Sequence, residues 1–164
     1  DHPKCYDHVD VVCRNEYIGW YDIPNPNPLP SELESHIKIR VQEELEKYHR
    51  YYPNKPIVVT ETGAEAKFGL RHEGEKLIRG TEEYQAYYLR FQIQEILRHR
   101  EYVVGVFPWC FADFMTRLEN HTCQIIPHLN LKGVLSFNRQ KKLGYYELQS
   151  IYKKIQEGRF DEIV

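Results

Sequence analysis

Three short runs of consecutive apolar residues constrain this chain more than any other feature of its sequence. They lie at 10–13, 56–63 and 102–107, and stretches with helical periodicity separate them. Each run is continuously apolar rather than alternating, which is typical of a strand buried on both faces. Buried strands separated by helices predict an α/β fold with a parallel sheet and right-handed crossovers.

Amphipathic patterns predict the helices between and after these strands. Apolar residues recur every three or four positions over 33–48, and Ser31 with Glu34 predicts a capping box at the start of that helix. Thr81 is expected to cap a second helix, and 145–156 is expected to form a closing helix.

The charge balance argues against two classes of partner. The chain has 22 Lys and Arg residues against 24 Asp and Glu residues, which gives a formal net charge of −2. A nucleic-acid binder or a polybasic membrane-surface protein would show a basic stripe instead. No run approaches the roughly 18 apolar residues of a membrane span. We therefore expect no nucleic-acid partner and no membrane partner.

The histidines and cysteines do not form the pattern of a metal site. The eight His and four Cys show no H-x-x-x-H, H-E-x-x-H or C-x-x-C spacing, so we expect no metal. The cysteines are interpreted mainly as buried thiols. The compartment of the protein stays unknown. A single glycosylation sequon at 120–122 (N-H-T) slightly favours a lysosomal or secreted protein over a cytoplasmic one.

Polar and aromatic side chains follow all three predicted strands, and Glu61 stands out among them. In parallel α/β sheets the chemistry lies at the carboxyl ends of the strands. A rigid apolar strand delivers Glu61 to this rim, and Gly63 turns the chain just beyond it. A positioned carboxylate is what a glycosidase needs. The alternative interpretation is a salt-bridged or helix-capping glutamate at a strand end.

Further candidates follow the first and third strands. Three side chains after the first strand could donate hydrogen bonds to sugar hydroxyls, or be ordinary solvated loop residues: Asn15, Tyr17 and Tyr21. Trp109 could form an apolar wall for a sugar ring, or belong to the core. Lys132, near Asn130, could hold a carboxylate, or lie on a solvated turn.

Four blocks of the sequence resemble the catalytic domain of glycoside hydrolase family 2, which includes β-glucuronidases and β-galactosidases. The blocks are 15–21 (N-E-Y-I-G-W-Y), 59–64 (V-T-E-T-G-A), 81–85 (T-E-E-Y-Q) and 109–114 (W-C-F-A-D-F). They occur in the family's order and at similar separations. The resemblance implies that residues 1–164 are the C-terminal portion of a (β/α)8 TIM barrel, about strands six to eight with their helices.

The resemblance also implies a reaction, the hydrolysis of β-glycosides by a retaining double displacement. By its position in the second block, Glu61 would be the nucleophile that forms a covalent glycosyl–enzyme intermediate. Asn15, Tyr17 and Tyr21 match pocket-lining positions, and Trp109 matches the tryptophan that lines the sugar pocket. No cofactor is implied, because two carboxyl groups suffice for this chemistry.

The sequence N-L-K-G at 130–133 resembles the N-x-K-G motif with which β-glucuronidases hold the uronate carboxylate. The Asn130 amide and the Lys132 ammonium both favour a carboxylate over a neutral hydroxymethyl group. The motif follows an expected irregular stretch at 115–130, where Ile126 replaces the family's usual arginine. The resemblance thus implies hydrolysis of terminal β-D-glucuronides, with a β-galactosidase-type activity as the alternative.

The general acid/base of the family has no counterpart among these residues. The family's general acid/base is a glutamate in an N-E-P block, which does not occur here, and a complete barrel needs about 250 residues. Glu65, Glu83 and Asp113 are carboxylates, but none matches that role. We expect the N-terminal remainder of the same enzyme to supply the acid, and exposed strand edges to favour association, including homo-oligomers. A non-catalytic carbohydrate-binding or interaction fragment is the alternative.

Overall fold

The computed structural model describes residues 3–117 and 124–164, so the 120–122 sequon lies outside the described residues. A parallel sheet with the order β1-β2-β3 consists of β1 (Val12–Asn15), β2 (Ile57–Thr62) and β3 (Val103–Pro108). The helices are α1 (Pro30–Tyr51), α2 (Glu82–Arg98) and α3 (Leu143–Gln156), with short 3-10 turns at Lys4–His8 and Phe160–Glu162. The predicted α/β fold with parallel strands is confirmed.

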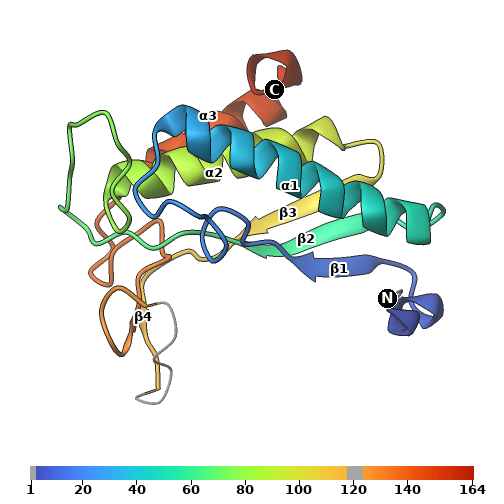
Figure 1. Cartoon of the computed structure of the whole chain (residues 1–164), viewed down its shortest axis with the longest axis horizontal. Helices are drawn as coiled ribbons and strands as arrows, with labels where there is room; N and C mark the ends of the chain where they lie inside the picture. The colour runs from blue at the N-terminus through green and yellow to red at the C-terminus, as the bar shows by residue number, and fades with distance from the viewer. Residues whose placement is uncertain (1–2, 118–123) are drawn as a thin grey trace.

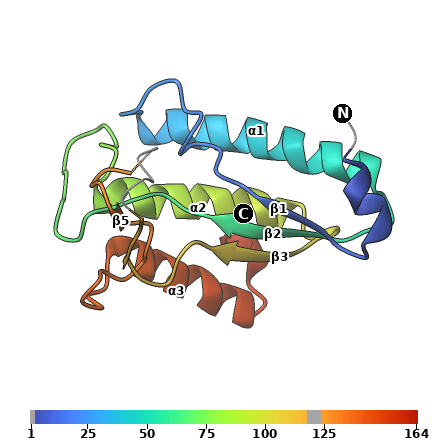
Figure 2. The same ribbon diagram turned by 90° about the horizontal axis from the view of Figure 1, so that it is seen from below.

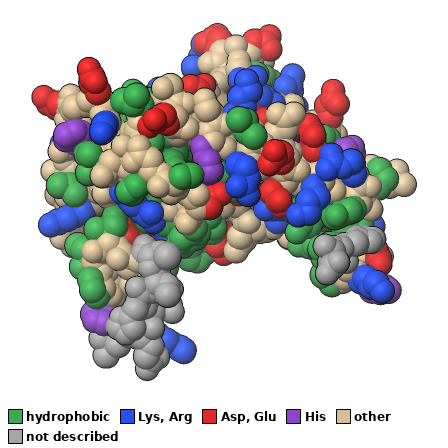
Figure 3. Space-filling model, viewed as in Figure 1, with side chains coloured by type: hydrophobic (Ala, Val, Ile, Leu, Met, Phe, Trp, Pro, Cys, Tyr) green, Lys and Arg blue, Asp and Glu red, His purple; other side chains and the backbone are tan. Residues whose placement is uncertain are grey.

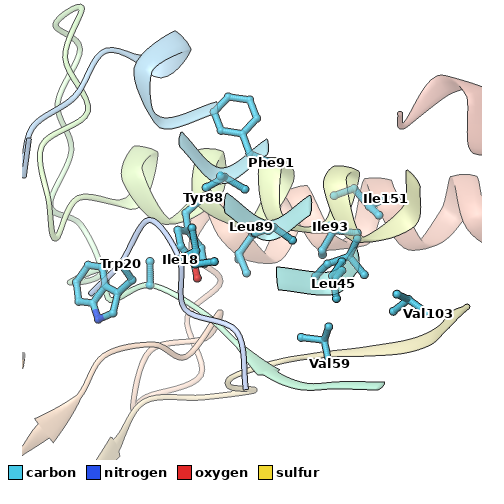
Figure 4. Close-up of a cluster of buried hydrophobic side chains, with 14 of the residues drawn as sticks. Ile18, Trp20, Leu45, Val59, Tyr88, Leu89, Phe91, Ile93, Val103 and Ile151 are labelled. Atoms are coloured by element: carbon cyan, nitrogen blue, oxygen red, sulfur yellow. The ribbon is translucent and has the colours of Figure 1, made fainter. Parts of the chain in front are cut away.

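The core lies between the sheet and the helices, which all cover the same face of the sheet (Figure 1). The strand side chains Val12, Ile57 and Val59 have no solvent exposure. The stripe of α1 that meets this core is fully buried: Leu33, Ile37, Val41 and Leu45. Figure 4 shows part of the cluster, to which α2 contributes Leu89 and Ile93. Each such aliphatic side chain contributes about 1.5–3 kcal/mol when buried.

The opposite face of the sheet has no helix over it within the described residues (Figure 2). On β3, Val104 is 64% exposed and Phe107 is 61% exposed. The molecule is hollowed along this side in Figure 3. The prediction of buried cysteines is wrong for Cys5 and Cys13, which are exposed. Cys5 lies in a 3-10 turn without buried residues, and Cys13 lies on the edge strand β1. Cys110 is half-buried, and Cys123 lies outside the described residues. Among the described residues, no helix is long and apolar enough to cross a bilayer.

The predicted capping box of Ser31 and Glu34 is wrong, because α1 begins two residues earlier than that box requires. Leu29 is the N-cap and Pro30 takes the first helical position. The fixed φ of proline and its missing N–H suit that position. The Glu32 carboxylate instead accepts a hydrogen bond from the Leu29 N–H, at 2.8 Å.

The stretch at 115–130, predicted to be irregular, contributes to a second small sheet. Its strands β4 (Phe114–Met115) and β5 (Leu129–Asn130) pair antiparallel. Such short strands leave no periodic signal in the sequence, so only the tertiary structure reveals them. The pairing brings Asn130 beside Phe114, at the carboxyl end of β3.

The two helix starts give a matched stability test. Thr81 caps α2 as predicted, with its Oγ1 accepting a hydrogen bond from the Tyr84 N–H at 3.3 Å. We expect Thr81→Ala to lower the free energy of unfolding by about 1 kcal/mol. Ser31→Ala should change it by less than about 0.5 kcal/mol, because Ser31 is exposed and caps nothing. Urea unfolding measures both, and equal losses would contradict the cap assignment.

Candidate active site

The carboxyl ends of β1 and β2 bring Glu61 together with the polar residues that follow β1. Asn15 and Glu61 are register partners, and Thr60 Oγ1 donates a hydrogen bond to Asn15 Oδ1 at 2.8 Å. The Tyr17 hydroxyl donates to Glu61 Oε2, also at 2.8 Å. Burial, and then this bond to Glu61, raise the pKa of Tyr17 well above its usual range. The Tyr17 hydroxyl therefore keeps its proton at neutral pH and can donate this hydrogen bond.

Lys132 places its ammonium group among three aromatic rings. Its side chain is only 5% exposed. The Nζ atom lies 5.7 Å, 5.4 Å and 5.3 Å from the ring centroids of Tyr17, Trp20 and Tyr21, within cation–π range. Among the described residues, no carboxylate forms an ion pair with this ammonium. The Trp20 ring is completely buried.

A cavity of about 310 Å³ opens beside Lys132. It is lined by Tyr21, Trp109, Phe114, Thr116, Gln124, Asn130 and Lys132. The Trp109 ring stands edge-on to Phe114, with centroids 6.0 Å apart. Sequence reasoning did not nominate Thr116 and Gln124, which lie in no recognised motif. The pairing of β4 with β5 brings the ends of these two segments together beside the cavity.

Asn130 contacts its own turn and also lines the cavity. Its Oδ1 accepts a hydrogen bond from the Lys132 N–H at 3.0 Å. The amide nitrogen Nδ2 of Asn130 can donate hydrogen bonds but cannot accept them. Asn130 and Lys132 are thus two lining residues whose side-chain nitrogens can donate hydrogen bonds. The seven residues predicted from the sequence lie in one contiguous region, joined through the contacts of Tyr17 and Lys132.

Two glycines are required where the loops of this region touch. A Cβ on Gly63 would lie 2.0 Å from the Trp109 carbonyl oxygen. A Cβ on Gly133 would lie 2.1 Å from the Asp113 nitrogen. Real Cβ atoms do not approach backbone this closely, so any larger residue would push the loops apart. The glycines of the T-E-T-G and N-L-K-G blocks are therefore needed so that the backbones of neighbouring loops can touch.

The T-E-E-Y-Q block lies at the start of α2 and holds loops rather than lining the cavity. The Tyr84 hydroxyl donates to the Gly19 carbonyl at 2.6 Å. The Gln85 amide donates to the Ala64 carbonyl at 2.9 Å. The first bond fixes the loop after β1, and the second fixes the loop after β2.

The other carboxylates considered from the sequence are all engaged: Glu65, Glu83 and Asp113. Glu65 accepts a hydrogen bond from the Leu131 N–H at 3.3 Å, and Glu83 pairs with Arg71 at 2.5 Å. Asp113 pairs with the buried Lys142 at 2.7 Å. Burial raises the pKa of Asp113 and lowers that of Lys142, and their hydrogen bond opposes both shifts. The described residues contain no cluster of His, Cys, Asp and Glu able to bind a metal ion.

The profile of the family described as glycosyl hydrolases family 2, TIM barrel domain, matches residues 3–157. The chain therefore belongs to this family of glycosidases, and its three parallel strands and helices are part of that domain. The region around Glu61, Tyr17 and Lys132 lies at the carboxyl ends of those strands, where barrel enzymes hold their active sites.

Named relatives of the chain are uronidases. The human β-glucuronidase is 33% identical over 149 residues, which are 90% of this chain and 21% of that protein. A β-D-glucuronidase structure from Dictyoglomus thermophilum is 31% identical with a TM-score of 0.74, covering 90% of this chain and 23% of that one. A family 2 β-galacturonidase from Eisenbergiella tayi, bound to galacturonate, is 26% identical with a TM-score of 0.74, covering 92% and 24%. The chain spans about a fifth of the length of the curated relatives it matches.

The close approach at Gly133 gives a second test. We expect Gly133→Ala to lower the free energy of unfolding by about 1–3 kcal/mol, because its methyl group would overlap backbone atoms. Gly105→Ala is the control, since its methyl group would meet nothing nearer than Val58 Cγ1 at 3.6 Å. The control should cost less than about 1 kcal/mol in urea unfolding. A tolerated Gly133→Ala would mean that the two loops do not touch.

Proposed function

We propose that the chain is the C-terminal part, about strands six to eight, of the barrel of a retaining β-glycosidase that cleaves terminal β-D-glucuronides. The observation that carries the proposal is the buried Lys132 ammonium. It lies beside the Tyr17–Glu61 hydrogen bond, and no carboxylate among the described residues pairs with it.

The charge of the cavity supports a carboxylate-bearing sugar. Burying an ammonium group costs desolvation energy, which the rings of Tyr17, Trp20 and Tyr21 offset only in part. A substrate carboxylate would supply the missing negative charge and accept bonds from both Lys132 and the Asn130 amide. A neutral hydroxymethyl group would leave that charge unpaired, which disfavours the galactosidase alternative.

Glu61 is proposed as the nucleophile. One carboxylate oxygen attacks the anomeric carbon while the general acid protonates the departing glycosidic oxygen, giving a covalent glycosyl–enzyme intermediate. The same acid, now a base, takes a proton from water, which attacks the anomeric carbon and releases Glu61. Tyr17 holds the Glu61 carboxylate in place through its 2.8 Å hydrogen bond. Trp109 is proposed to form the apolar wall for the sugar ring.

The acid/base is proposed to come from the N-terminal remainder of the same enzyme. The carboxylates Glu65, Glu83 and Asp113 are engaged in structural contacts. The exposed Phe107 and the open edges of the sheet support the presence of further strands, and curated relatives are several times longer. An apolar groove of about 440 Å³ between α3 and the end of β3 is proposed to be covered by that remainder.

Covalent trapping tests the nucleophile and the sugar class together. Activated 2-fluoro glucuronide and 2-fluoro galactoside are incubated with the chain alone and with the full-length enzyme that carries it. We expect a uronyl adduct that peptide mapping places on Glu61, and none in the Glu61→Gln variant. Only a galactosyl adduct would favour the alternative specificity. No adduct on the full-length enzyme would favour a non-catalytic fragment.

Lys132→Ala tests the carboxylate contact in the full-length enzyme. The change removes a charge-assisted hydrogen bond, so we expect kcat/KM for a glucuronide to fall about 10- to 100-fold. Turnover of a neutral galactoside should change less than about twofold. Equal losses on both substrates would contradict the proposed role of Lys132.

A further inference from the structure

The turn that carries Lys132 has three successive carbonyl groups held by two buried side chains. Leu131 O accepts a hydrogen bond from Lys142 Nζ at 3.0 Å. Lys132 O and Gly133 O both accept from Gln85 Nε2, at 3.4 Å and 3.2 Å. Lys142 lies at the N-cap of α3 and Gln85 lies on α2. Two different helices therefore fix the backbone at Lys132 and on both sides of it.

Lys142 uses its whole donor capacity in this contact. Its side chain has no solvent exposure. Besides Leu131 O, the ammonium donates to Ala66 O at 2.6 Å and to Asp113 Oδ1 at 2.7 Å. An ammonium has three donors, and all three are taken by acceptors from three separate loops. The N-L-K-G turn is thereby tied to the loop after β2 and to the loop after β3.

Like Lys142, Gln85 is held by buried hydrogen bonds and does not line the cavity. It has no solvent exposure and also donates to Ala64 O at 2.9 Å. Neither Gln85 nor Lys142 lines the 310 Å³ cavity, so neither touches a sugar bound there. Among the residues that line the cavity, Lys132 is the one that they bind directly, through its backbone carbonyl. A lysine side chain has four rotatable bonds, so its ammonium is well placed only if its Cα is held firmly.

We propose that Gln85 and Lys142 are positioning residues for uronate recognition, which clamp the N-L-K-G turn and aim the Lys132 ammonium at the substrate carboxylate. This inference rests on the proposed function of Lys132. It assigns the preference for a uronide over a neutral glycoside partly to residues outside the cavity. Loosening the clamp lowers affinity for the carboxylate, while Glu61, which is held by Tyr17 from a different loop, keeps its place.

The test measures substrate preference in the full-length enzyme. Kinetics on 4-nitrophenyl β-D-glucuronide and 4-nitrophenyl β-D-glucoside give a ratio of kcat/KM values that does not depend on the folded fraction of the preparation. We expect Gln85→Met to lower this ratio about tenfold, mainly by raising KM for the glucuronide. Adding Gln85→Met to Lys132→Ala should leave the ratio unchanged, because the clamp changes the substrate preference through Lys132.

Gln92→Met is the matched control. Gln92 is on the same helix, is equally buried, and donates to the Ile18 carbonyl at 2.5 Å, in the loop that carries Tyr17. Its loss should affect both substrates alike and leave the ratio within twofold. If Gln85→Met does not fold, Lys142→Met combined with Asp113→Asn replaces it, because this pair removes both charges together.

The outcomes separate the two proposals. Equal losses on both substrates in Gln85→Met, or a ratio that falls further in the Lys132→Ala background, would overturn the positioning role. In either case, a selective loss in Lys132→Ala alone would still support the proposed uronidase function. If Lys132→Ala alone is not selective, the proposed carboxylate contact fails, and the positioning role fails with it.

Discussion

Buried carbonyl groups in the loops after the strands need donors, and α2 and α3 supply them. Gln92 binds the Ile18 carbonyl, Tyr84 binds the Gly19 carbonyl, and Gln85 binds the Ala64 carbonyl. A buried carbonyl without a donor costs about 1–3 kcal/mol, so each bond removes a penalty as well as fixing a position. Because these loops have almost no regular structure of their own, the geometry of the candidate site depends on these bonds.

Tyr17 links the two charged groups of the candidate site and keeps them apart. Its hydroxyl donates to the Glu61 carboxylate, while its ring lies 5.7 Å from the Lys132 ammonium. Among the described residues, Glu61 and Lys132 form no ion pair with each other. If they paired directly, each would neutralise the other and neither would be available to a ligand. The aromatic ring lets both charges share a small, partly buried space.

The open face of the sheet bears on whether this chain functions by itself or within a larger domain. The helices cover one face of the sheet, and none lies over the other face within the described residues (Figure 2). On the edge strand β3, Val104 and Phe107 are exposed. Apolar side chains on an open sheet favour association, because their burial is the main stabilising term available. The match to about a fifth of each curated relative agrees with a domain that is larger than this chain. Its activity and its partners therefore stay proposals about the whole enzyme.

The sequence by itself determined the three strands of the parallel sheet, the helices between them and the family. These follow from local patterns: continuous apolar runs, periodic stripes, the Thr81 cap and four ordered motifs. Only the tertiary structure decided how the motifs meet. The β4–β5 pairing, the cavity residues Thr116 and Gln124, and the clamp of Gln85 and Lys142 join segments far apart in the chain. Local patterns record which residues are buried, but a buried glutamine or lysine shows its partners only when the chain has folded around it.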